Sequence, residues 1–464
     1  MTAQEKIRNR KIGVIGMARS GMAVARLAKK MGGVPFVSDS GKAVSLTAQT
    51  SELKSLGIAC ETDHHTDQLL LNDYLVLSPG VPLGIEILKR AREKGVPIFS
   101  EIEFASWLCR GKVVAITGSN GKTTTTTLTG EICKAAGIDT HVCGNIGRPF
   151  TDVVEHVTER SVVVLEVSSF QLETIGDFRP DIAAILNITP DHLDRHGSFD
   201  AYRKAKLRIT ENQSPDQHLI LNRDDQESSS LRPETQAKIH WFSTRGHSEN
   251  NATAVSDGRL SVTVGGKASD IIAARDISIP GPHNLQNAAA SALMASLLHI
   301  PASVIADTLR KFPGVEHRIE RCETVAGVSF INDSKATNVD SVVQALRSVE
   351  TPLYLILGGR DKGGSYLPIA EAGKGKIRGL LVIGEATDKI LAALGKTFPT
   401  HTAKSLEEAV ERGFALAEPG ETVLLSPACA SFDMFDNFEH RGRVFKAAVA
   451  SLKNGRKKNE TVTK

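Results

Sequence analysis

The sequence predicts an α/β protein with mostly parallel sheets. Short apolar runs rich in β-branched residues alternate with helix-like segments along the whole chain of 464 residues, which is the pattern of strands joined by helices. Most of these runs are apolar continuously rather than at every second position. Strands covered by helices on both faces have this appearance, so a buried parallel sheet is expected. This length also predicts roughly three domains, at about 150 residues each.

The expected strands divide the chain into three blocks, which we place at 1–104, 105–314 and 315–464. The first and last are expected to be Rossmann-like strand–helix domains. Within the central block, residues 243–276 are more polar and predict a β-rich excursion. The ten apolar runs predicted as strands, in order, are 11–17, 34–39, 74–80, 113–118, 161–169, 182–189, 218–222, 352–359, 380–384 and 422–427.

Composition and charge argue against binding to nucleic acid and against insertion into a membrane. The net charge of +3 is too small to argue for binding to nucleic acid. No apolar stretch approaches the roughly 20 residues of a membrane-spanning helix. The six cysteines are scattered without metal-finger spacing, as in proteins with reduced thiols. We therefore expect a cytoplasmic protein without nucleic acid and without membrane insertion. We also expect a monomer.

The stretch "AITGSNGKTTTTTL" predicts a phosphate-binding loop between a strand and a helix. Gly118 and Gly121 allow a tight turn whose backbone N–H groups point inward, although the spacing is shorter than in the common P-loop. Lys122 can neutralise phosphate charge, and Thr123 or Thr124 can offer a hydroxyl to Mg²⁺. The alternative is a glycine-rich turn without a ligand. The loop predicts that the central domain is of the P-loop type and holds a polyphosphate; the family resemblance given below makes it an ATPase-type domain.

Polar residues follow other strands of the central block, at the edge where ligands bind in α/β sheets. Glu166 ends one apolar run and is a candidate Mg²⁺ ligand, or else a solvated strand end. Asn145, in "CGNIG", could contact a substrate oxygen or simply occupy a turn. A denser group, in "NITPDHLDRHG", indicates metal or substrate binding rather than a structural histidine, and it comprises Asn187, Asp191, His192, Asp194 and His196.

The outer blocks carry weaker signals. In the third block, the turns "INDSKATN", "GGRDKGG" and "SPACASFDMFDNFEHRG" follow three strands and together indicate a concave polar site, although each could be an ordinary turn. In the first block, "GVIGMARSGMAVARLAKK" is similar to a dinucleotide-binding turn but lacks its third glycine. Asp39 ends the second strand, where a ribose-binding acid would lie.

In combination, these segments resemble the Mur ligase family. The segments "TGSNGKTT", "EVSSFQLE", "NITPDHLDRHG", "GPHNLQNAAA", "HRIE" and "NDSKATN" are similar to its signatures and occur in its order over nearly the whole chain. The resemblance implies an ATP-dependent peptide-bond ligase of peptidoglycan precursor synthesis. ATP would phosphorylate the carboxylate of UDP-N-acetylmuramoyl-L-alanine, and the amine of D-glutamate would attack the acyl phosphate. Magnesium, two ions by the resemblance, and lysine would neutralise the reacting anions.

The resemblance also assigns residues. The catalytic residues would be Lys122, Glu166, His192 and Lys206. The metal ligands would be Thr123, Glu166, His192 and Lys206, the last as a carbamate. ATP would be bound by Gly118, Ser119, Asn120, Gly121, Lys122, Thr123, Thr124, Asn287, Arg318 and Asp333. The UDP substrate would be bound by Ser20, Asp39, Ser40, Ser78, Gly80 and Asn145. D-glutamate would be bound by Lys335, Thr337, Lys362, Ser431 and Phe438.

Three other interpretations remain open at this point. The first is another amide ligase on the same scaffold, such as folylpolyglutamate synthase or a diaminopimelate-adding Mur ligase, whose Asp-Asn-Pro-Arg segment is absent from this sequence. The second is a nucleotide-binding protein without catalysis, against which the intact Lys122, Glu166 and His192 argue. The third is a dehydrogenase, for which the first glycine turn is a poor match.

Overall fold

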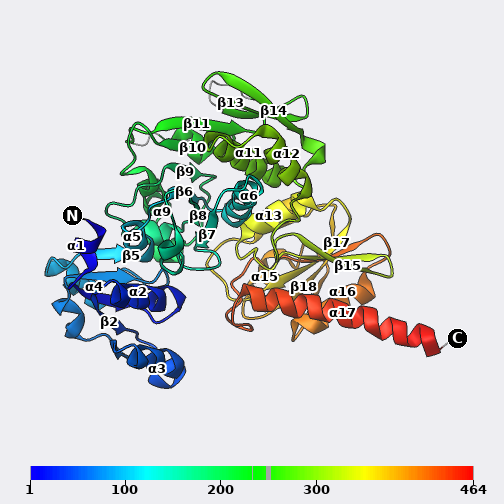
Figure 1. Ribbon diagram of the computed structural model, residues 1–464. Helices are drawn as coiled ribbons and strands as arrows, with labels where there is room; N and C mark the ends of the chain where they lie inside the picture. The colour runs from blue at the N-terminus through cyan, green and yellow to red at the C-terminus, as the bar shows by residue number, and fades with distance from the viewer. Residues whose placement is uncertain (1, 232–233, 247–251, 463–464) are drawn as a thin grey trace. The chain divides into compact units, whose positions relative to one another are not determined.

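The computed structural model describes residues 2–231, 234–246 and 252–462. The chain forms three sheets, coloured blue, cyan to green, and yellow to red in Figure 1. The predicted α/β class and three-domain organisation are confirmed. The chain divides into two compact units, the first made of 1–277 with 286–312 and the second of 278–285 with 313–464. The predicted boundaries between the domains stay predictions.

The N-terminal sheet has five parallel strands in the order β3-β2-β1-β4-β5. Its central strands are buried on both faces, as their continuous apolar runs predicted. The strands are β1 Lys11–Ile15, β2 Val34–Ser38, β3 Ala59–Glu61, β4 Tyr74–Leu77 and β5 Ile98–Ser100. The helices are α1 Ala3–Ile7, α2 Arg19–Lys30, α3 Thr47–Ser55, α4 Glu86–Glu93 and α5 Glu101–Ser106.

The central sheet has nine strands in the order β14-β13-β12-β11-β10-β9-β6-β8-β7. It is parallel from β7 to β12, and the last two pairings are antiparallel, as in the predicted β-rich excursion, of which residues 247–251 lie outside the described part. The strands are β6 Lys112–Thr117, β7 Thr140–Gly144, β8 Val162–Glu166, β9 Ile182–Ile185, β10 His218–Asn222, β11 Lys238–Ser243, β12 Ala252–Ser256, β13 Arg259–Val264 and β14 Lys267–Ala273. The helices are α6 Lys122–Ala135, α7 Ser169–Leu172, α8 Leu193–His196, α9 Phe199–Leu207, α10 Gln226–Ser230, α11 Pro282–Leu297 and α12 Ala302–Lys311.

Helix α6 forms although its first half is a run of threonines, which are poor helix formers. Tertiary packing outweighs this intrinsic preference, because most of these threonines are buried. Two threonine hydroxyls of α6 bond to helix α11, Thr125 Oγ1 to Asn287 Oδ1 at 3.1 Å and Thr129 Oγ1 to Ser291 Oγ at 3.1 Å. Threonines of α6 therefore join these two helices.

The C-terminal sheet has six strands in the order β15-β16-β20-β17-β18-β19, and only the edge strand β15 pairs antiparallel among those described. The strands are β15 Glu320–Val325, β16 Val328–Asn332, β17 Leu353–Gly358, β18 Ile377–Ile383, β19 Thr400–Thr402 and β20 Thr422–Leu425. The helices are α13 Val339–Ser348, α14 Leu367–Ala372, α15 Thr387–Leu394, α16 Leu406–Leu416 and α17 Phe438–Val462.

Two further expectations can be compared with this fold. The six cysteines are free thiols in the structure, as their scattered spacing predicted. Among the residues that the structure describes, none of the helices combines the length and the hydrophobicity needed to cross a bilayer.

Candidate functional site

The predicted phosphate loop joins β6 to α6 and has the backbone of an anion-binding turn. Gly121 precedes the helix at φ 82° in the left-handed region, and no side chain caps the helix there. The first N–H groups of α6 therefore face the turn, where an anion would be stabilised by them and by the helix dipole. A Cβ atom at Gly121 would lie 2.4 Å from Asn287 Oδ1, so this position excludes any side chain.

The loop is held by the segment that follows β9. Asn187 Oδ1 accepts the Asn120 N–H at 2.8 Å, and its Nδ2 donates to the Asn120 carbonyl at 3.1 Å. Ser119 Oγ donates to the Thr189 carbonyl at 2.8 Å and lies 2.9 Å from the Tyr202 hydroxyl. Asn187, predicted to contact metal or substrate, thus positions the loop. Tyr202 was missed by the sequence analysis, because no local motif marks it.

Two lysines meet at one carbonyl of the loop. Lys122 Nζ donates to the Gly118 and Ser119 carbonyls at 2.7 and 2.9 Å. Lys206 Nζ donates to the same Gly118 carbonyl at 2.8 Å and is only 1% exposed. Burial lowers the pKa of Lys206 well below its usual value, and the charge of Lys122 lowers it further. Lys122, at the start of α6, and Lys206, from α9, therefore meet at the phosphate loop.

Glu166 and Asn145 are joined side by side at the ends of β8 and β7. Asn145 Nδ2 donates to Glu166 Oε1 at 2.9 Å, and the Asn145 N–H donates to the Glu166 carbonyl at 2.9 Å. Strands β8 and β6 are adjacent, so the carboxylate of Glu166 lies on the edge of the sheet that carries the phosphate loop. The structure thus brings two predicted residues into direct contact.

The histidines after β9 have different environments. His192 has left-handed backbone, with φ 52°, and its Nε2 lies 3.6 Å from Asp191 Oδ2. His196 is buried, with Nε2 2.9 Å from Ser169 Oγ and Nδ1 3.2 Å from Glu173 Oε1. We therefore assign His196 a structural role, unlike the predicted one. The side chain of Asp194 lies outside the described residues.

All six residues predicted for the UDP substrate line one pocket of about 450 Å³. It begins beside the ends of β2 and β3, passes the start of α2 and reaches the ends of β4 and β7. No side chain caps helix α2, so the first N–H groups of the helix can face an anion, whereas the Gly16 and Met17 N–H groups of the preceding turn donate to the Ser38 carbonyl and to Asp39 Oδ2. The six residues are Ser20, Asp39, Ser40, Ser78, Gly80 and Asn145.

Arg195 joins the His192 segment to this pocket. Its Nη1 donates to the Pro79 carbonyl and its Nη2 to the Val81 carbonyl, each at 2.8 Å. The guanidinium lies over the ring of Phe170, 3.7 Å from its centroid. Pro79 and Val81 both line the pocket. Arg195 was missed by the sequence analysis, although it lies inside a quoted motif, because its partners are more than a hundred residues away.

In the second unit, Asp333 lies buried beside the turn that carries Arg318. Its Oδ1 accepts the Ile319 N–H at 3.2 Å, and its Oδ2 accepts the Ser426 hydroxyl at 2.8 Å. Burial raises the pKa of Asp333 to about 6, although Arg318 and Ser426 lower it. Asn287 lies in the first unit, at the phosphate loop. A common nucleotide site for Asn287, Arg318 and Asp333 stays a prediction.

Four of the five residues predicted for D-glutamate form two contacts in the second unit. Lys335 Nζ lies over the ring of Phe438, 4.7 Å from its centroid. Lys362 Nζ donates to Thr337 Oγ1 at 3.3 Å, and Thr337 is hydrogen-bonded through its N–H to the Lys335 carbonyl. Ser431, the fifth, is buried in the loop after β20. The two lysines thus come from the loops after β16 and β17, two strands of one sheet that are separated by β20.

Buried Arg441, which the sequence analysis missed, holds these loops together. Its Nε donates to Ser334 Oγ at 3.0 Å, and its Nη1 and Nη2 donate to the carbonyls of Cys429 and Ser334 at 3.2 and 2.8 Å. Burial lowers its pKa to about 10. Arg441 is therefore a structural cation beneath the loops rather than a group that faces a ligand.

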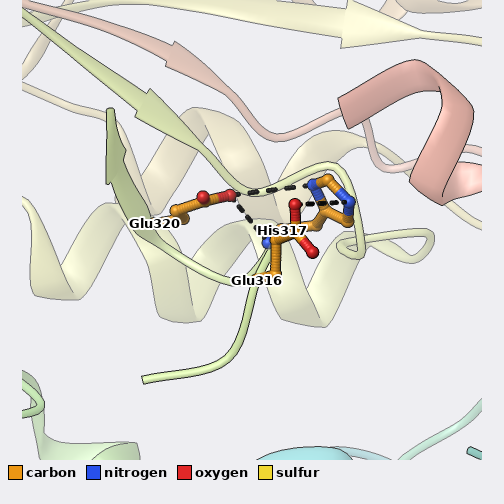
Figure 2. A group of neighbouring side chains, drawn as sticks. All are labelled: Glu316, His317 and Glu320. Carbon is orange, nitrogen blue, oxygen red and sulfur yellow. Dashed lines mark hydrogen bonds and ion pairs between the residues drawn. The ribbon is translucent and has the colours of Figure 1, made fainter. Parts of the chain in front are cut away.

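Glu316, His317 and Glu320 place one possible metal-ligating atom each within 4.8 Å of one another (Figure 2). A cation already lies there, because Lys446 Nζ contacts Glu316 Oε1 at 2.5 Å and Glu320 Oε1 at 3.0 Å. Asn332 Nδ2 donates to Glu320 Oε2 at 3.0 Å and contacts His317 Nδ1 at 2.9 Å. We interpret this group as an ion-pair cluster that fixes the "HRIE" segment.

Comparisons with known proteins give a consistent result over the whole chain. Family descriptions match in three parts, "Mur ligase MurD-like, N-terminal domain" over 10–100, "Mur ligase middle domain" over 116–295 and "Mur ligase, glutamate ligase domain" over 317–429. The UDP-N-acetylmuramoylalanine--D-glutamate ligase of Thermoanaerobacter sp. (strain X514) is 43% identical over 453 residues, 97% of this chain and 100% of that protein. The protein of the same name from Geobacter sp. (strain M21) is 44% identical over 451 residues, 97% and 99% of the two chains. The crystal structure of the UDP-N-acetylmuramate-alanine ligase of Thermotoga maritima has the same fold, with a TM-score of 0.59 and 20% identity over 95% of this chain and 99% of that one.

Proposed function

The chain belongs to the Mur ligase family, and we propose that it joins D-glutamate to UDP-N-acetylmuramoyl-L-alanine in peptidoglycan precursor synthesis. ATP first phosphorylates the carboxylate of the UDP substrate. The amine of D-glutamate then attacks the acyl phosphate, and the tetrahedral intermediate collapses to the amide, releasing phosphate. Phosphorylation is needed because a free carboxylate is a poor electrophile.

The observation that best supports this proposal is that the pocket ends at Asn145, beside Glu166. Six residues expected to bind the UDP substrate line it, and the last of them, Asn145, donates its amide to Glu166 at 2.9 Å. A nucleotide-linked substrate that fills this pocket would present its far end to the edge of the sheet that carries the phosphate loop. The substrate carboxylate and the γ-phosphate of ATP would then be neighbours.

Lys122 and the backbone of the loop would allow these two anions to approach. Lys122 contacts the Gly118 carbonyl, and the N–H groups at the start of α6 face the same turn. Cationic groups fixed before the reaction stabilise the charge that is transferred with the phosphoryl group, without having to reorganise.

Magnesium fits the side chains at this edge of the sheet. Thr123 offers a hydroxyl, Glu166 a carboxylate whose Oε1 is held by Asn145, and His192 an imidazole. Oxygen-rich sets of this kind suit Mg²⁺, and the hydrogen-bonded amide orients the carboxylate. Lys206 would join them as a carbamate, an anion in place of a cation. The metal, two ions by the family resemblance, would neutralise the phosphate and carboxylate oxygens.

D-glutamate would bind to the second unit. Lys335 and Lys362 would pair with its two carboxylates, with Thr337, Ser431 and Phe438 around them. The ammonium of Lys335 already faces the Phe438 ring, and Lys362 already contacts Thr337. Arg318 and Asp333 would hold the nucleotide from the same unit.

The proposal is tested by measuring phosphate release from ATP, Mg²⁺ and UDP-N-acetylmuramoyl-L-alanine with D-glutamate, L-glutamate or L-lysine. We expect release with D-glutamate alone, together with the matching amide product by mass spectrometry. Release that needs L-lysine, or none with D-glutamate, would overturn the assignment. Chelation of Mg²⁺ should stop release, and its restoration by added Mg²⁺ controls for damage to the protein.

A further inference from the structure

His65 lines the nucleotide pocket, although no motif marks it in the sequence. It follows β3 and lies with Asp39 and Ser40 at the end of the pocket formed by β2 and β3. In the sheet order β3-β2-β1-β4-β5, this end is separated from Ser78 and Asn145 by β1 and the start of α2. The pocket therefore has three successive parts, near His65, near the α2 N-terminus and near Asn145.

A chain of hydrogen bonds fixes the position of the proton on His65. The Ser38 hydroxyl donates to Glu61 Oε1 at 2.6 Å and lies 2.7 Å from His65 Nδ1. Glu61 also accepts from the Thr66 N–H and hydroxyl. Burial raises the pKa of Glu61, but these hydrogen bonds lower it by more, so Glu61 is a carboxylate that only accepts. Ser38 has a single hydrogen and gives it to Glu61, so Nδ1 of His65 must be the donor to Ser38.

The other ring nitrogen of His65 is then an acceptor. Burial lowers the pKa of His65 below its usual value, more than the carboxylates of Glu61 and Asp39 raise it, and His64 lowers it too. The imidazole is therefore neutral near pH 7, with its hydrogen on Nδ1 and a lone pair on Nε2. In a neutral histidine without such a relay, either nitrogen could carry the hydrogen.

The orientation of the substrate in the pocket determines which of its groups lies near His65. The reacting carboxylate must lie near Asn145, because Asn145 bonds to Glu166 beside the phosphate loop. The diphosphate fits the uncapped N-terminus of the twelve-residue helix α2, in the middle of the pocket. The base is then the part that reaches His65.

We propose that His65 reads the base of the UDP substrate, with Nε2 accepting the N3–H of uracil while Glu61 and Ser38 hold the imidazole in the accepting tautomer. This inference rests on the proposed function, which gives the pocket a uridine nucleotide. Uracil has a donor at N3, whereas cytosine has an acceptor there. Cytosine would therefore set two lone pairs against each other, and the fixed tautomer prevents His65 from turning into a donor.

The test is calorimetric titration of the full-length chain with UDP, CDP and 2′-deoxy-UDP. The wild-type chain should bind UDP about tenfold to a hundredfold more tightly than CDP. This factor corresponds to the loss of the hydrogen bond to His65 Nε2, which CDP leaves without a donor. In His65→Leu this ratio should approach one, mainly through weaker binding of UDP. ADP binding and the thermal unfolding midpoint of the variant show whether it is folded.

Three further variants separate recognition from packing. His65→Gln should bind UDP again but also accept CDP, because an amide can turn to donate. Ser38→Ala should lower the ratio in the same way with His65 intact, because the tautomer is no longer fixed. His64→Gln is the matched control: its side chain is exposed, it does not line the pocket, and its ratio should equal that of the wild type.

The possible results distinguish a failure of the inference about His65 from a failure of the ligase assignment. If His65→Leu changes the ratio of UDP to 2′-deoxy-UDP but not that of UDP to CDP, His65 binds the ribose and the inference is wrong. If the wild-type chain does not bind UDP, the inference is also wrong. A ratio that depends on His65, in a chain that releases no phosphate with D-glutamate, would support the inference and overturn the ligase. Normal ligase activity with an unchanged ratio would overturn the inference alone.

Discussion

Arg195→Ala removes the contact between the His192 segment and the pocket proposed to bind the UDP substrate. Two hydrogen bonds from the guanidinium to backbone carbonyls, each 2.8 Å, contribute roughly 1.5–3 kcal/mol apiece when made by a charged donor. The contact with Phe170 adds about 0.5–2 kcal/mol. Because Arg195 is partly exposed, water replaces some of this, and we expect a net loss of about 3 kcal/mol. If about half of that holds the Pro79–Val81 loop in place, binding to the pocket weakens about tenfold.

The assay is binding of UDP and of ADP by calorimetry, followed by steady-state kinetics. Arg195→Ala should raise the Kd for UDP and the KM for the UDP substrate about tenfold, and should leave the Kd for ADP within about twofold. Arg195→Lys should be intermediate, because an ammonium reaches one carbonyl at a time and does not stack as a guanidinium does. Arg203→Ala, on α9 with ion pairs to Asp200 and Glu227, is the matched control. An unchanged Kd for UDP in a folded Arg195→Ala variant would refute the proposed coupling.

Three other substitutions test separate parts of the account. Lys122→Ala should leave the unfolding midpoint unchanged but reduce turnover by at least about a hundredfold, and near-normal turnover would mean that the nucleotide lies elsewhere. Gly121→Ala should abolish ADP binding, because its Cβ would lie 2.4 Å from Asn287 Oδ1 and φ is 82°; ADP binding as in the wild type would contradict the described loop. Burial raises the pKa of Glu101 from 4.5 to about 7, so between these pH values the folded chain holds a proton that the unfolded chain has released. The free energy of unfolding therefore falls by about 3 kcal/mol as the pH rises from 4.5 through 7. Glu101→Gln should therefore gain in unfolding midpoint over the wild type between pH 5 and pH 8, and a difference between the two proteins that does not change with pH would show that Glu101 is already ionised.

The sheets could be predicted because their signal is local. Continuous apolar runs mark strands buried on both faces, and the rule that ligands bind beyond the carboxyl ends of parallel strands then groups the polar turns. Each of the ten predicted runs overlaps an observed strand. Short edge strands such as Ala59–Glu61 and Thr400–Thr402 were missed, because three residues carry too little pattern.

The site was predicted less completely because part of it depends on contacts between distant segments. Spacing along α9 could not distinguish Lys204 from Lys206, whereas in the structure the first is 73% exposed and the second 1%. Family resemblance, not periodicity, selected Lys206. His65, Arg195 and Tyr202 act through partners that only the fold brings near, so no local sequence pattern marks them.

The central claim is that ATP transfers its γ-phosphoryl group to the substrate carboxylate, and an isotope label tests it most directly. UDP-N-acetylmuramoyl-L-alanine labelled with ¹⁸O in its carboxylate is turned over with ATP, Mg²⁺ and D-glutamate, and the released phosphate is analysed by mass spectrometry. Because the acyl phosphate keeps one carboxylate oxygen on phosphorus, we predict one ¹⁸O atom in each phosphate released. Phosphate without ¹⁸O, formed alongside the amide product, would contradict the mechanism.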